Sequence, residues 1–114
     1  MPESPTSRSL AYLRERGYVA EKVEYYNPFS KRRVDLFGCI DIVAVTAGEA
    51  ILGVQATTVA NQAARKAKAL SLPGLQAWLG AGGRFEVHGW GKHGLLGKRK
   101  TWDVTVWRRL EDVV

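Results

Sequence analysis

Apolar side chains recur with a helical period in the first part of the chain and then alternate with polar ones. Residues 6–16 (TSRSLAYLRER) carry apolar positions at helical spacing, and Thr6 or Ser7 is available as the N-cap. Gly17 supplies a C-terminal stop. The pattern therefore predicts a first helix over residues 6–16.

Three segments rich in β-branched and aromatic residues follow and predict strands. The first covers residues 18–26 and ends at Asn27-Pro28, since proline interrupts regular strand pairing. The second covers residues 34–45 with a bend at Gly38, and the turn TAGE joins it to a third over residues 50–58.

A narrow apolar stripe in residues 59–74 predicts a helix, because its members recur at helical spacing. The stripe consists of Ala60, Ala63, Ala64, Ala67 and Leu70. We expect these small side chains to pack closely against a sheet and to leave Arg65, Lys66 and Lys68 on the opposite face.

The rest of the chain predicts a short helix over residues 75–83 and strands over residues 84–90 and 101–110. A loop rich in Gly and Lys, residues 91–100, links the two strands. The order helix, three strands, helix, strand, strand predicts an α/β fold in which helices flank a mixed central sheet.

Length and composition set further limits. With 114 residues and 46% hydrophobic content, residues 1–114 fit a single domain. The apolar runs are too short for a membrane span and the first residues lack the apolar core of a signal peptide, so we expect a soluble cytoplasmic protein. Cys39 is the only cysteine, which excludes an internal disulfide and a Cys-rich zinc site, and we expect it in the core.

Basic residues are in excess and clustered. Lys and Arg number 17 against 11 acidic residues, a net charge of +6, which is typical of domains that bind polyanions. Each cluster alone is also explained by a solvated surface, but four clusters in a short chain favour phosphate contacts. The predicted nucleic-acid-binding residues are Lys31, Arg32, Arg33, Arg65, Lys68, Lys92, Lys98, Arg99 and Lys100.

Asp41 is an acidic residue inside the apolar run GCIDIVAV, where a lone buried carboxylate costs several kcal/mol. If the second and third strands pair as a hairpin across TAGEA, Asp41 lies opposite Gln55. Their oxygens are then near enough to hold one hard cation. The alternative is that Asp41 is the buried structural partner of an Arg or Lys.

This hairpin resembles the core of the PD-(D/E)XK nuclease superfamily, above all its small Holliday-junction-resolvase-like and Mrr-like members. The resemblance covers about residues 6–90 and implies an αβββαβ core, like that of restriction endonucleases. It also implies Mg²⁺, or Mn²⁺, held by Asp41, Gln55 and the carbonyl of Ala56. Thr57 occupies the position of the family's lysine, and the glutamate that many resolvases carry in the first helix is missing.

The expected catalytic set is Asp41, Gln55 and Lys66, which the resemblance implies, and Asp35, which strand parity adds. Lys66, or its neighbours Arg65 and Lys68, would replace the missing lysine from the following helix. Asp35 has the strand parity of Asp41 but lies roughly 20 Å away along a straight strand, so it joins the site only if the chain turns near Gly38. Otherwise it is a turn aspartate or a partner of the basic segment KRR.

Other residues with possible chemistry receive simpler interpretations. His88 and His93 are five apart across glycines, and we expect exposed loop histidines rather than a metal pair. The four tryptophans are expected to pack in the core or at edges, although Trp90 beside Lys92 suits a position flanking nucleic acid.

The sequence thus predicts a Mg²⁺-dependent endodeoxyribonuclease that acts on branched or otherwise structured DNA, as in recombination and repair. A resolvase needs two active sites, so the resemblance also implies a homodimer. The alternative is a nucleic-acid-binding module on the same fold that has lost catalysis. The basic clusters by themselves suit DNA and RNA alike.

Overall fold

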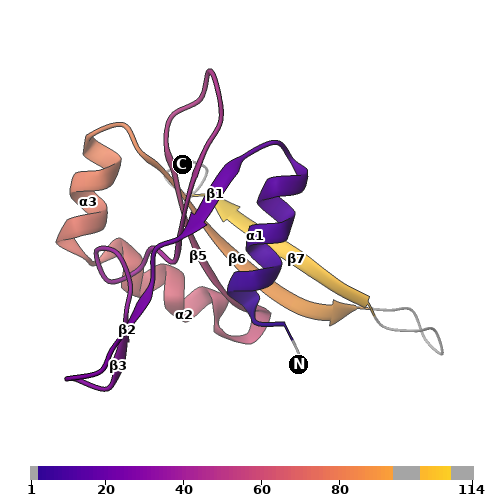
Figure 1. The fold of residues 1–114 in the computed structure, drawn as a ribbon, viewed down its shortest axis with the longest axis horizontal. Coiled ribbons are helices and arrows are strands. Elements are labelled where there is room, and N and C mark those ends of the chain that lie inside the picture. Colours follow the sequence, from indigo (N-terminus) through magenta and orange to yellow (C-terminus); the bar gives the residue numbers. More distant parts are fainter. Residues whose placement is uncertain (1–2, 94–100, 109–114) are drawn as a thin grey trace.

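A mixed five-stranded sheet with three helices forms the body of the protein (Figure 1). The computed structural model describes residues 3–93 and 101–108. In chain order the elements are α1 (Pro5–Glu15), β1 (Val19–Lys22), β2 (Tyr25–Asn27), β3 (Arg32–Val34), β4 (Ile42–Val45), β5 (Leu52–Thr58), α2 (Val59–Leu70), α3 (Pro73–Gly80), β6 (Arg84–His93) and β7 (Thr101–Arg108). The predicted α/β class with a mixed sheet and flanking helices is confirmed.

The main sheet has the order β1-β4-β5-β6-β7, and only the β5–β6 pair is parallel. One core layer packs under α1, where Leu13 contacts apolar residues of β1, β4 and β5. A second layer lies under α2 and α3 around Ala69, Leu75, Phe85 and Val87. Strands β2 and β3 form a separate two-stranded hairpin beside this sandwich (Figure 1).

Helix α1 begins earlier than the sequence suggested. Ser4 is the N-cap, and its side-chain oxygen accepts a hydrogen bond from the backbone N–H of Ser7 at 3.1 Å. Pro5 follows at the first helical position, where its missing N–H costs nothing. Thr6, one of the expected caps, is instead buried and donates to Glu24 Oε1 at 3.1 Å.

The predicted strands 18–26 and 34–45 are each interrupted. The first divides into β1 and β2, with Val23 and Glu24 between them. Of the second, only Ile42–Val45 forms a strand of the main sheet, β4, and Val34 is the last residue of β3, because the chain makes a tight turn over residues 36–40. Phe37 and Gly38 both have positive φ, 56° and 83°, which a continuous strand does not contain. Cys39 is buried in this turn, and burial raises the pKa of its thiol to about 11, so it is a protonated core residue.

The predicted register of the central hairpin is confirmed. Ile42 pairs with Val54, Val43 with Gly53 and Ala44 with Leu52, which places Asp41 at the level of Gln55 just before β4 begins. The backbone N–H of Asp41 donates to the Val54 carbonyl at 2.8 Å.

The expected orientation of α2 is wrong. Its four alanines Ala60, Ala63, Ala64 and Ala67 are exposed. The helix buries Gln62 and Ala69 instead, and Gln62 Nε2 donates to the carbonyls of Val87 at 2.9 Å and Thr105 at 2.7 Å. These two bonds offset the cost of burying an amide, so a polar residue sets the face of the helix.

Strand β6 runs to His93, beyond the predicted end at residue 90. The remaining loop residues 94–100, with Lys98, Arg99 and Lys100, and the last two positions of the predicted strand 101–110 lie outside the described residues. Within the described part of the chain, no helix has the length and apolarity that crossing a membrane requires.

Candidate metal centre

A pocket of about 690 Å³ opens where the start of α1, the β2–β3 hairpin, the end of β5 and helix α2 meet. Asp41, Gln55, Ala56 and Thr57 contribute to its wall. The register of β4 and β5 thus brings Asp41 and Gln55 to one pocket, as the sequence predicted.

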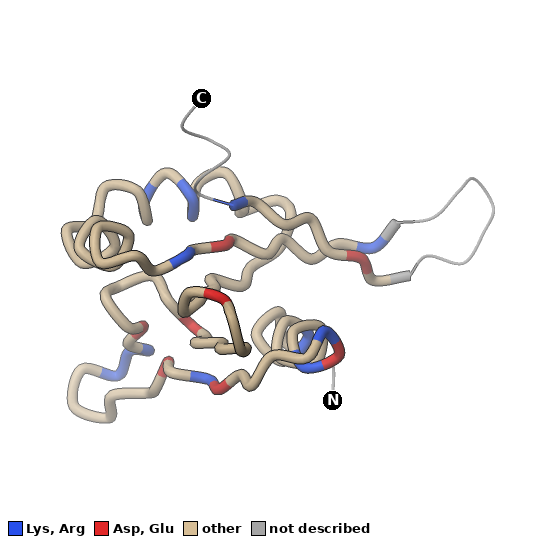
Figure 2. The backbone as a smooth tube through the Cα atoms, turned by 90° about the horizontal axis from the view of Figure 1, so that it is seen from above, with Lys and Arg blue, Asp and Glu red and all other residues tan. Residues whose placement is uncertain are grey.

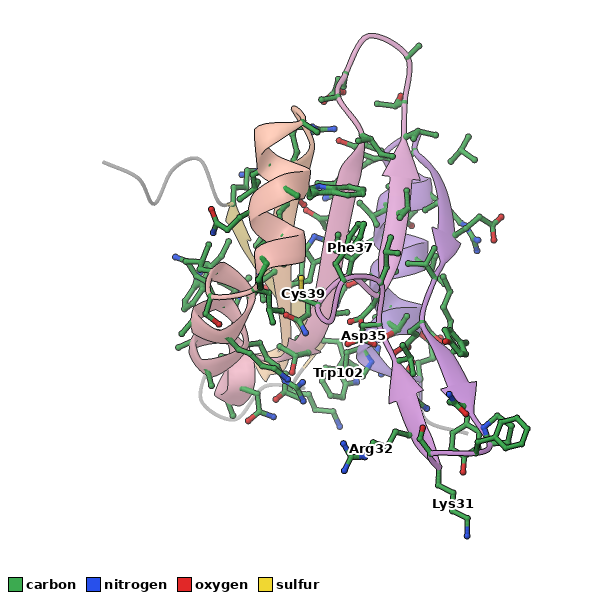
Figure 3. The ribbon with its side chains drawn as sticks, turned by 90° about the vertical axis from the view of Figure 1, so that its left-hand side faces the viewer. Lys31, Arg32, Asp35, Phe37, Cys39 and Trp102 are labelled. Carbon is green, nitrogen blue, oxygen red and sulfur yellow. The ribbon has the colours of Figure 1, made fainter. Side chains whose placement is uncertain are left out.

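Three carboxylates gather in this pocket. Glu24, Asp35 and Asp41 each offer an oxygen, and these oxygens all lie within 4.8 Å of one another. Glu24 stands between β1 and β2, Asp35 directly follows β3, and Asp41 directly precedes β4. Figure 3 shows Asp35 at the base of the hairpin.

Asp35 reaches Asp41 because the chain reverses at residues 36–40. Leu36 and Ile40 form an isolated antiparallel bridge, so the segment is not the straight strand that would hold the two carboxylates apart. The condition set by the sequence, a turn near Gly38, is met. Whether Asp35 acts in the site stays a prediction.

Glu24 is the member of this cluster that sequence reasoning missed. Its side chain is only 7% exposed, although it lies in the charged segment EKVEYY. Its parity is that of Ala20, the buried position of β1, but Lys22 has the same parity and is exposed. The alternation along β1 therefore did not single out Glu24.

Asp41 is held in an environment that disfavours its charge. Its side chain accepts a hydrogen bond from the backbone N–H of Ala56 at 2.9 Å, and the residue is 5% exposed. Burial raises the pKa of Asp41 to about 8, the Ala56 hydrogen bond opposes this rise, and the charges of Asp35 and Glu24 add to it. A cation among the three carboxylates would relieve this repulsion.

Gln55 lines the same pocket as the three carboxylates. It is 4% exposed, and its Oε1 atom has no hydrogen-bond partner among the residues that the structure describes. A buried acceptor without a donor is uncommon and points to a missing ligand. Three carboxylates and an amide oxygen form a donor set of the kind that Mg²⁺ and Mn²⁺ prefer, so the residues present fit such an ion.

Basic side chains surround the acidic cluster. Arg32 and Arg33 reach the pocket from the hairpin, and Arg65 and Lys68 reach it from α2. Figure 2 shows basic positions along the hairpin and acidic positions at its base. These four side chains form the basic rim of the pocket. One of them already contacts the acidic cluster, because Arg33 Nη1 lies 3.6 Å from Glu24 Oε1.

Lys66 does not line the pocket, contrary to the expectation that it replaces the missing lysine. Its Nζ atom lies 4.8 Å from the ring centroid of Trp107 on β7. The helical period separates it from Arg65 and Lys68, because a change of one or two positions turns a side chain to another face. The geometry therefore favours Arg65 or Lys68 for that role.

The remaining predicted nucleic-acid contacts are dispersed. Lys31 is exposed in the hairpin turn, and Lys92 lies with its Nζ atom 5.3 Å from the ring centroid of Trp102. The Cζ atom of Arg8 lies 4.0 Å from the centroid of the same ring.

The interpretation of His88 as an exposed loop residue is wrong. His88 is fully buried on β6, where Nδ1 lies 2.9 Å from Ser9 Oγ and Nε2 lies 2.9 Å from Glu86 Oε1. Trp90 is also buried and donates to Ser9 Oγ at 2.9 Å, so it does not flank a ligand. The side chain of His93 lies outside the described residues.

The buried group of Ser9, His88 and Glu86 resembles a hydrolase triad in composition only. Ser9 and His88 are both fully buried and are packed between α1 and the sheet. A nucleophile needs access to its substrate, which this position lacks. The group therefore stabilises the packing of α1 on β6.

Comparisons with family models, with curated proteins and with solved structures each find no match to this chain.

Proposed function

We propose that this chain is a metal-dependent nuclease whose ion is held by Asp41, Asp35, Glu24 and Gln55. The observation that carries the proposal is the convergence of three carboxylates with the unpartnered oxygen of buried Gln55 in one pocket. A pocket with acidic walls and a basic rim suits a phosphodiester, since the rim binds phosphate and the walls bind the ion that phosphate chemistry uses.

The resemblance to the PD-(D/E)XK superfamily supports this proposal. The succession α1, β1, β4, β5, α2, β6 is compatible with the αβββαβ core of restriction-endonuclease-like folds, with the β2–β3 hairpin and α3 as additions. Asp41 and Gln55 occupy the positions that the resemblance assigns to metal ligands. Glu24 would take over the contribution of the missing first-helix glutamate from a different element.

Each residue of the pocket then has a separate task. A divalent ion bound there would act as a Lewis acid and would activate water for hydrolysis. Asp41 and its carboxylate neighbours would hold that ion, and the Ala56 N–H fixes the orientation of the Asp41 side chain. Arg65 and Lys68 bind the phosphate and offset the charge that develops on it, a task that the Thr57 hydroxyl performs poorly.

A second candidate is a nucleic-acid-binding module on the same fold that no longer cleaves. The specific observation in its favour is Thr57, which occupies the lysine position and faces the pocket as a neutral side chain. Both candidates share DNA as partner, branched or structured, and both admit the homodimer that the resemblance implies.

A cleavage assay distinguishes the two. Duplex, single-stranded and four-way-junction DNA are incubated with the full chain, with and without Mg²⁺ or Mn²⁺. We expect metal-dependent cleavage that Asp41→Asn and Glu24→Gln abolish, while Asp103→Asn, at an exposed position of β7, leaves it unchanged. Absence of cleavage on every substrate with both metals would favour the binding module.

A further inference from the structure

The β2–β3 hairpin stands apart from the main sheet and ends in an ordered turn (Figure 1). Asn27 Oδ1 accepts hydrogen bonds from the backbone N–H groups of Phe29 at 2.9 Å and Ser30 at 3.3 Å. The N–H of Lys31 donates to the Asn27 carbonyl at 2.8 Å. These three bonds fix the tip in one conformation, as an Asx turn does.

Phe29 sits at this tip and is 95% exposed. Tyr25 and Tyr26 on the same hairpin are also exposed. Leaving an aromatic side chain in water forgoes about 2 to 3 kcal/mol of burial free energy, and a fixed turn prevents the ring from folding back onto the protein. The hairpin therefore presents an apolar group that only a partner can cover.

The charges around Phe29 identify the class of partner. Lys31, Arg32 and Arg33 follow it after Ser30, and Figure 3 shows Lys31 and Arg32 along the outer part of the hairpin. An exposed aromatic ring next to three cations is complementary to nucleic acid, in which bases stack on aromatic rings and phosphates pair with Lys and Arg.

The hairpin also connects this tip to the candidate metal centre. Ser30, Arg32 and Arg33 line the pocket that contains Asp35 and Asp41. From Phe29 to Asp35 the chain passes through β3, so at ~3.3 Å per residue the two are at most about 20 Å apart. That distance corresponds to about six nucleotides of one strand at 3.4 Å each.

We propose that the β2–β3 hairpin is a wedge that inserts Phe29 between bases at an unstacked step of DNA, such as a bulge or branch point. The basic residues of the hairpin hold the phosphates beside that step and lead the strand into the pocket. The inference rests on the proposed function and deepens it, since it names a distorted duplex as the preferred substrate. Insertion of an apolar side chain is favoured at such a step, because less stacking has to be broken there.

The test measures binding without metal, so that it does not depend on cleavage. Two DNA duplexes, one fully paired and one with a two-nucleotide bulge, carry 2-aminopurine beside the chosen step, and EDTA is present. We expect the full chain to bind the bulged duplex roughly tenfold more tightly and to change the 2-aminopurine emission. Phe29→Ala should remove both the preference and the emission change, because it removes the stacking ring.

Two control variants separate stacking from charge and from general apolar surface. Arg32→Ala should weaken binding to both duplexes equally and lower the salt dependence, since it removes a phosphate contact. Ile51→Ala truncates an exposed apolar residue directly before β5, whereas the pocket lies near the end of that strand, so it should change neither the bulge preference nor the 2-aminopurine emission. A bulge preference that survives in Phe29→Ala, or that Ile51→Ala also loses, would overturn the wedge.

Binding and cleavage results together distinguish the two proposals. A Phe29-dependent bulge preference in a chain that never cleaves supports the wedge and rejects the nuclease. Cleavage by a chain with no such preference supports the nuclease and rejects the wedge. If the wild-type chain binds neither duplex at low salt, the hairpin serves another class of partner, such as an acidic protein surface, and the wedge is rejected.

Discussion

Asp41→Asn should stabilise the metal-free protein and at the same time remove its response to Mg²⁺ or Mn²⁺. The structure places three carboxylate oxygens within 4.8 Å of one another. At that separation and an effective dielectric constant of about 20, two like charges repel by about 3 kcal/mol or more. The asparagine side chain of this variant would keep an oxygen for the Ala56 N–H and offer an amide N–H to the neighbouring carboxylates.

The net gain is smaller than the repulsion because the rim cations already offset part of it. Arg33 lies 3.6 Å from Glu24, for example. We therefore expect Asp41→Asn to raise the free energy of unfolding by about 1 to 3 kcal/mol. The Tm should rise by roughly 4 °C for each kcal/mol gained. Burial raises the pKa of Asp41 to about 8, so the gain should be largest above that pH, where the wild-type carboxylate is ionised.

Thermal unfolding of both proteins at about pH 8.5 tests this, with EDTA and then with increasing Mn²⁺. At a metal concentration about 100-fold above Kd, the wild type should gain about 3 kcal/mol, whereas the variant should gain little. Asp103→Asn makes the same chemical change at an exposed position and should leave both measurements unaltered. If Asp41→Asn lowers Tm in EDTA, Asp41 is a structural partner; if its Mn²⁺ response equals that of the wild type, it is not a ligand.

Three further predictions concern the rest of the molecule. Arg65→Ala should weaken DNA binding and reduce the slope of log K against log salt by about one, whereas Lys66→Ala should change neither, and titration at several salt concentrations measures this. Burial raises the pKa of Glu86, but its basic partners outweigh burial and lower it below 4.5. Wild-type stability should therefore fall as pH drops from about 4.5 through the folded-state pKa, and denaturant titrations of Glu86→Gln should show no such fall from this group. Gly89→Ala should cost about 1 to 3 kcal/mol in the same titrations, since a Cβ there overlaps the buried amide of Gln62; an unchanged midpoint would contradict this packing.

The pattern of the sequence alone determined the parts of the fold that depend on neighbours along the chain. Alternation and turn length predicted the β4–β5 register, and with it the convergence of Asp41 and Gln55 on one pocket. The helical period predicted α1 to within one residue at each end. These features follow from the side-chain period, which is two residues in a strand and 3.6 in a helix. Each segment has its period independently of the rest of the fold.

Other features depended on contacts between segments far apart in sequence, and only the tertiary structure decided them. Glu24 joins Asp41 because β1 pairs with β4, where the N–H of Val23 donates to the Asp41 carbonyl. Asp35 joins because the turn with positive φ at Gly38 folds the chain back, a condition that the sequence named and only the fold decided. The spacing of the four alanines of α2 predicted that they form the buried face of the helix. The helix instead buries Gln62, because its amide donates to backbone carbonyls of β6 and β7. His88 is buried because Ser9 and Glu86 satisfy both of its ring nitrogens. A polar side chain can be buried where partners exist, and those partners come from other segments of the chain.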